Sequence, residues 1–114
     1  MQTSAAVPPR INGSEVVDEH SAVIGGSLVL FCPVTGLPPP DIQWAREGDP
    51  ISAESDPSLH VTDGGHHLQL FNTQLIDAGS YTCTATNPAG TASKRFTVNV
   101  IGKLNLFSTE IIAL

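Results

Sequence analysis

Two cysteines and one tryptophan, each in a segment where apolar and polar residues alternate, constrain the fold of this chain more than any other feature. Cys32, Trp44 and Cys83 all occupy apolar positions of such segments. Side chains two positions apart lie on the same face of a β-strand, so each of the three residues is expected on the inward face of a strand. The cysteines could form a disulfide, bind a metal or remain free thiols, and their surroundings must decide which.

Turn residues divide the chain into many short segments. Examples are Gly25-Gly26, Asp63-Gly64-Gly65 and Asn87-Pro88-Ala89-Gly90, and similar signals recur about every eight to twelve residues. Proline, glycine and β-branched residues interrupt every candidate helix, so we predict an all-β fold. The expected strands are residues 9–12, 16–20, 27–34, 41–47, 50–53, 58–62, 66–72, 79–87 and 90–100.

The bulk properties exclude several classes of partner. The chain has 114 residues, which suits one domain, and a formal net charge of −6 with only five lysines and arginines. Without a basic face, binding to nucleic acid is disfavoured. No apolar run is long enough to span a bilayer, and residues 1–7 lack the charged and apolar segments of a signal peptide. We therefore expect neither direct membrane insertion nor a secretion signal within these residues.

The segment from Asp77 to Cys83 adds a second structural feature. Tyr81 lies two residues before Cys83, at the start of its strand, which is the position of a tyrosine corner. Its ring is expected in the core, and its hydroxyl is expected to bond to the backbone of the preceding turn. Asp77 supplies the turn chemistry, and Leu70 is a further expected core residue on the strand before it.

These features together resemble an immunoglobulin domain of the I-set and, more loosely, the immunoglobulin repeats of hemicentin-type extracellular matrix proteins. Too few residues separate Trp44 from Leu68 for the extra hairpin of a variable domain. The resemblance covers residues 8–101, which leaves 1–7 as an N-terminal linker and 102–114 as a C-terminal tail of uncertain origin. It rests on Pro8-Pro9, Gly25 and residues 27–32, 36–44, 68–70, 77–83 and 85–90.

The resemblance implies an immunoglobulin-like β-sandwich, a Greek key of two antiparallel sheets. In such a sandwich Cys32 and Cys83 lie on opposite sheets, so a disulfide between them would cross the core beside Trp44. Closing a loop of about fifty residues stabilises a fold by about 4 kcal/mol in the chain-entropy model. The alternative is a pair of reduced, buried thiols, as in cytosolic muscle-type I-set domains.

Other candidate sites are few. Asn12-Gly13-Ser14 fits the N-glycosylation acceptor in a turn-prone stretch between the first two strands. His20, His60, His66 and His67 lack the spacing of a zinc site, so no metal is expected. Neither a nucleophile motif nor a phosphate-binding glycine loop occurs, so we expect no cofactor and no enzyme activity.

The function that the resemblance implies is protein binding for cell adhesion or matrix assembly, as one bead of a larger multidomain protein. The expected partners are other proteins, copies of the same domain among them, and adjacent domains of the parent chain. The expected location is extracellular, either secreted or at the cell surface. A ligand-binding module of a receptor ectodomain and an intracellular muscle-type structural domain are the alternatives. Residues 102–114 are unusually apolar for a linker, and we expect them to be unstructured or to pack on a neighbour.

Overall fold

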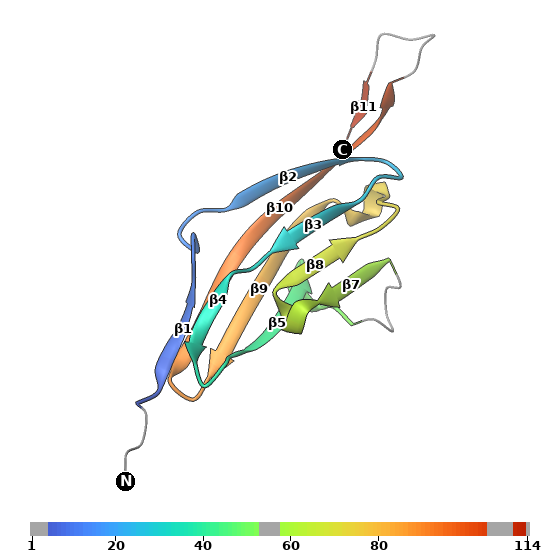
Figure 1. Ribbon diagram of the computed structural model, residues 1–114. Helices are drawn as coiled ribbons and strands as arrows, with labels where there is room; N and C mark the ends of the chain where they lie inside the picture. The colour runs from blue at the N-terminus through green and yellow to red at the C-terminus, as the bar shows by residue number, and fades with distance from the viewer. Residues whose placement is uncertain (1–4, 53–57, 105–110, 114) are drawn as a thin grey trace.

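The computed structural model describes residues 5–52, 58–104 and 111–113. Two β-layers face each other, as Figure 1 shows. One hydrophobic core lies between them. The predicted all-β sandwich is confirmed. Among the described residues the only helical segments are two single-turn 3-10 helices, η1 (Asp63–Gly65) and η2 (Leu75–Asp77).

The first layer is built from an antiparallel sheet in the order β3-β8-β7 and from the antiparallel pair β1-β4. Its strands are β1 (Val7–Ile11), β3 (Leu28–Phe31), β4 (Val34–Leu37), β7 (Leu59–Thr62) and β8 (His67–Leu70).

The second layer has the order β11-β10-β9-β5-β6, with β2 also paired to β10. Its strands are β2 (Asp18–Val23), β5 (Asp41–Arg46), β6 (Asp49–Pro50), β9 (Gly79–Asn87), β10 (Gly90–Leu104) and β11 (Ile111–Ala113). The strand expected at 50–53 is thus only the short β6, and residue 53 lies outside the described residues. The strand expected at 90–100 continues to Leu104, where β11 pairs with it.

The strand expected at 27–34 is two strands, because Pro33 interrupts it. The amide of Cys32 donates to the carbonyl of His66 at 2.7 Å and ends the ladder with β8. Pro33 has no N–H to continue that ladder. Its carbonyl instead accepts from the amide of Asn12 at 3.2 Å, and the chain beyond it pairs with β1.

The strand expected at 16–20 begins later, at Asp18, because a turn occupies the residues before it. The amide of Ser14 donates to the carbonyl of Ile11 at 3.1 Å, and the amide of Val16 donates to the carbonyl of Gly13 at 3.1 Å. This turn carries the chain from the first layer to the second. As a result β2 runs parallel to β10, and it is the one parallel pair among the described strands.

The core lies between the layers and consists of the inward side chains of both. Leu70 is 1% exposed and lies opposite Leu28 on β3 and Leu59 on β7. The buried cluster is Ile11, Leu30, Cys32, Val34, Trp44, Leu59, Leu68, Leu70, Tyr81, Cys83, Ala85, Phe96, Val98 and Val100.

One glycine is required by the core itself. The indole N–H of Trp44 donates to the carbonyl of Gly65 at 2.7 Å, so the end of η1 approaches strand β5 closely. Gly65 is buried, has φ of +102°, and a Cβ there would lie 2.7 Å from the Cβ of Ile42. Only glycine meets both conditions, the left-handed backbone and the absence of a side chain.

Replacing Gly65 by alanine should destabilise the fold more than the matched change Gly48→Ala. Both glycines have positive φ, +102° and +85°, but nothing lies within 4 Å of a Cβ at Gly48. The strained backbone is common to both variants, so the difference between them isolates the clash. We expect the free energy of unfolding in urea to fall by about 1–3 kcal/mol more in Gly65→Ala. Equal losses would show that the close approach to Ile42 is unimportant.

Candidate protein-interaction faces

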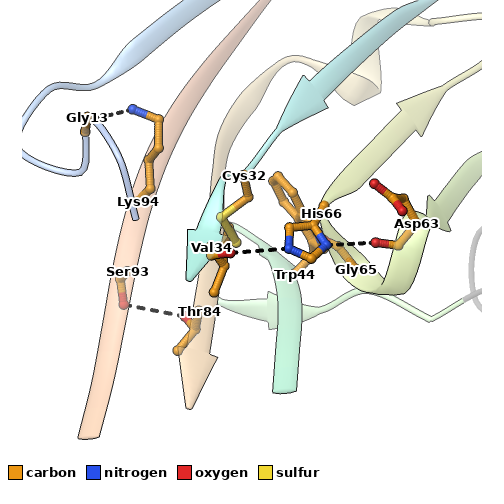
Figure 2. Close-up of a disulfide and its surroundings, with 11 residues drawn as sticks. Gly13, Cys32, Val34, Trp44, Asp63, Gly65, His66, Thr84, Ser93 and Lys94 are labelled. Atoms are coloured by element: carbon orange, nitrogen blue, oxygen red, sulfur yellow. Dashed lines mark hydrogen bonds between the residues drawn. A yellow bond between two sulfur atoms is a disulfide. The ribbon is translucent and has the colours of Figure 1, made fainter. Parts of the chain in front are cut away.

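A disulfide joins the two layers at the centre of the core. The Sγ atoms of Cys32 and Cys83 are 2.09 Å apart, and both residues are fully buried. Trp44 lies directly opposite Cys83 on the neighbouring strand, and its ring centroid is 5.3 Å from that of Phe96. Figure 2 shows the disulfide with the indole beside it. The sulfurs are thereby shielded from water, and the two layers have a fixed separation.

Tyr81 and Asp77 form a second anchor where the chain crosses between the layers. The hydroxyl of Tyr81 donates to the carbonyl of Asp77 at 2.7 Å, in the geometry of a tyrosine corner. The buried carboxylate of Asp77 accepts from the amide of Gln74 at 2.8 Å and pairs with Arg46 at 3.3 Å. The turn before β9 is therefore held by both main-chain and side-chain bonds.

Asn12 is exposed and lies immediately after β1, at the start of the turn that leads to β2. Gly13 follows with φ of +78°, and Ser14 is also exposed. The acceptor triplet is therefore at the surface, in a turn fixed by main-chain bonds at both ends.

Sequence reasoning missed Lys94, which fastens this turn to the opposite layer. Its side chain is 3% exposed, and its Nζ donates to the carbonyls of Gly13 at 2.7 Å and Val16 at 3.1 Å. It also pairs with Asp18 at 3.3 Å and lies 5.4 Å from the centroid of the Phe96 ring. Lys94 has the same inward parity on β10 as Phe96, and a charge at an inward position was the signal that could have found it.

Asn87 was assigned only to a turn, yet it joins three loops at one end of the sandwich. Its Nδ2 donates to the carbonyls of Val7 at 2.8 Å and Pro38 at 3.1 Å. Its Oδ1 accepts from the amide of Ala89 at 2.8 Å. A single side chain thus ties the β9–β10 turn to the start of β1 and to the loop before β5.

The outer face of the first layer carries apolar and aromatic side chains. The rings of Phe31 and His67 stack with centroids 4.9 Å apart, and those of His60 and Phe71 meet edge to face at 5.1 Å. Phe31 is 50% exposed and Phe71 is 43% exposed. We call this surface the aromatic face, and its residues are Val29, Phe31, His60, His67 and Phe71.

The outer face of the second layer is chemically different, because small hydroxyl side chains line it. Thr84 and Ser93 lie opposite each other on β9 and β10 with their hydroxyl oxygens 3.5 Å apart, and Thr86 and Thr91 repeat the pattern at 3.3 Å. Figure 2 includes the first of these pairs. The two sides of the sandwich therefore offer different chemistry to a partner.

A groove of about 900 Å³ lies where the aromatic face meets β1 and the turn after it. His66 forms one wall, since its Nδ1 lies 2.8 Å from the carbonyl of Asp63 and its Nε2 lies 3.4 Å from that of Val34. The residues that line it include Arg10, Asn12, Phe31, Pro33, Asp63 and His66. This combination of an aromatic ring with polar groups is typical of a binding surface.

The described part of the chain holds no group of three or more histidine, cysteine, aspartate or glutamate side chains placed to bind a metal ion. No helix within it is long and apolar enough to cross a membrane.

Residues 14–100 match the immunoglobulin I-set domain family, which is more than half of the chain. The chain belongs to the immunoglobulin I-set. The resemblance drawn from the sequence is thereby confirmed, and the I-set is a family of non-catalytic modules.

The I-set domain is similar to domains of much larger proteins. It is 39% identical to mouse hemicentin-1 over 94 residues, covering 82% of this chain and 2% of that protein. It is 30% identical to rat neural cell adhesion molecule 1 over 112 residues, covering 96% of this chain and 13% of that protein. Among solved structures, an immunoglobulin domain from a titin M10 complex with obscurin-like 1 superposes with a TM-score of 0.75. That match has 29% identity and covers 89% of this chain and all of the other.

Replacing Lys94 by methionine should loosen the turn at residues 13–17. Methionine keeps the buried methylenes but leaves the carbonyls of Gly13 and Val16 without their charged donor, at a cost of about 2–3 kcal/mol in the free energy of unfolding. Arg95→Met is the matched control, because Arg95 is the exposed neighbour on the same strand, and its change should stay within about 0.5 kcal/mol. Chemical denaturation measures the stability, and amide hydrogen exchange locates the loosening. Unchanged exchange at residues 13–17 would contradict the anchoring role.

Proposed function

We propose that this I-set domain is an extracellular module, secreted or at the cell surface, that binds other proteins in cell adhesion or matrix assembly. It acts as one rigid bead of a longer chain and catalyses no reaction. When many such domains in one chain bind at the same time, the weak contacts of single domains add up to a high overall avidity.

The observation that carries this proposal is the buried bond between Cys32 and Cys83. Disulfides form and persist in oxidising compartments and are rare in the cytosol of most organisms. The similarity to hemicentin-1 and to a neural cell adhesion molecule points the same way. The similarity to an immunoglobulin domain of the titin M10 complex with obscurin-like 1 favours the alternative, an intracellular structural domain, in which the same two cysteines would be reduced.

The aromatic face is the surface best suited to a protein partner. Exposed aromatic rings are enriched at the centres of protein interfaces, where they supply most of the binding free energy. Phe71 and His60 hold each other in place, so little side-chain entropy is lost when a partner covers them. The hydroxyl-lined face of β9 and β10 offers less apolar area to bury.

The state of the two cysteines in protein from its natural source separates the rival compartments. We expect denaturation with an alkylating reagent and no reductant to leave the mass unchanged, because both sulfurs are bonded. Reduction before alkylation should add two labels, which serves as the internal control. Addition of two labels without reduction would overturn the extracellular assignment.

The aromatic face can be tested with a multivalent form of the domain on matrix laid down by cultured fibroblasts. Phe71→Ser removes an exposed ring and should weaken retention about tenfold or more. Gln43→Ser changes an exposed side chain on the opposite face and should alter retention less than roughly twofold. Both variants should keep the melting temperature of the parent. Equal retention of all three proteins would exclude Phe71 from the contact.

A further inference from the structure

We propose that the carbohydrate attached to Asn12 folds back into the groove and packs on the ring of Phe31, so that it forms part of this surface of the domain. The inference rests on the proposed function, because only a chain that enters the secretory pathway receives such a carbohydrate. It goes beyond the proposed function, because it states that the carbohydrate fills the groove and that it contacts Phe31.

The acceptor is held in a defined position. The main-chain bond from Ser14 to Ile11 closes the turn around Asn12, and Gly13 takes the left-handed conformation that this turn needs. The buried Lys94 then fixes the carbonyl of Gly13 to the opposite layer at 2.7 Å. A carbohydrate on Asn12 therefore starts from a rigid base, which limits the directions in which it can extend.

The strand pairing places the acceptor on the same face as the ring. Ile11 is buried, so its neighbour Asn12 faces outward, and the amide of Asn12 donates to the carbonyl of Pro33. Phe31 precedes Pro33 by two positions and shares its outward face. Asn12 and Phe31 both line the groove, so a carbohydrate on Asn12 starts at the edge of a surface that contains the Phe31 ring.

The groove has the chemistry of a carbohydrate-binding surface. The C–H face of a pyranose ring is apolar and packs on an aromatic ring, and the Phe31 ring is half exposed and already held in place by His67. Around it, Arg10 supplies donors and Asp63 supplies acceptors for the sugar hydroxyls and the N-acetyl group. Covering Phe31 in this way removes apolar area from water on a face that would otherwise leave it exposed.

A carbohydrate in the groove would divide the aromatic face. It would cover the end with Phe31 and leave the end with His60 and Phe71 open to a protein partner. The same modification would then both protect the domain from unspecific association and restrict the partner to one end of the face.

The test uses the full chain secreted from cultured mammalian cells behind a heterologous leader, with the carbohydrate trimmed to its first N-acetylglucosamine. We expect mass spectrometry to find Asn12 occupied and nuclear Overhauser contacts to join the N-acetyl methyl group to the Phe31 ring. Ser14→Ala removes the acceptor signal and should lower the melting temperature by about 3 °C or more, whereas Ser14→Thr keeps the signal and should not.

The coupling to Phe31 is measured by repeating the comparison in two backgrounds. In Phe31→Ser the effect of Ser14→Ala on the melting temperature should vanish. In Val29→Ser, a matched change on the same strand and face that does not line the groove, it should persist. An unoccupied Asn12, or an occupied one with no contact to Phe31 and no coupling, overturns the proposal. Because the leader supplies secretion, this outcome is independent of the thiol assay, which tests the natural compartment.

Discussion

The bond between Cys32 and Cys83, with Trp44 beside it, is the constraint on which the rest of this structure depends. It fixes the distance between the layers and the register of their inward side chains. The indole then reaches Gly65, so η1 is held against β5, and the adjacent His66 lies near the carbonyls of Asp63 and Val34. One wall of the groove is therefore a direct consequence of how the core is closed.

The surfaces that a partner would meet are held by polar side chains as much as by the core. Lys94 crosses from the second layer to the turn after β1, and Asn87 ties three loops at one end. A buried ammonium such as that of Lys94 is costly unless its donors have acceptors, and here these are the carbonyls of Gly13 and Val16 and the carboxylate of Asp18. Loops fixed in this way present a defined surface, which suits a module that works by binding.

The two sides of the sandwich differ in what they can do. One carries exposed rings at Phe31 and Phe71, and the other carries the hydroxyl pairs of β9 and β10. Apolar burial is the main source of affinity. The exposed rings of the aromatic face are therefore the groups that gain most from contact with a partner or with a carbohydrate. The proposed carbohydrate packs on the end of this face with Phe31, and the proposed protein partner binds the end with Phe71. Both proposals require the secretory pathway, and a disulfide is typical of proteins that pass through it.

The sequence by itself determined that the chain forms short β-strands and that Cys32, Trp44 and Cys83 face inward, because a strand's period of two is local and is set by neighbouring residues. The sequence also contains an indication of the role of Lys94, because it is a charged residue at an inward position of its strand. Only the tertiary structure decided that Lys94 reaches the turn after β1 and that Asn12 shares a face with Phe31. These contacts depend on register between segments far apart in the chain, and alternation along one strand contains no information about which strand lies beside it.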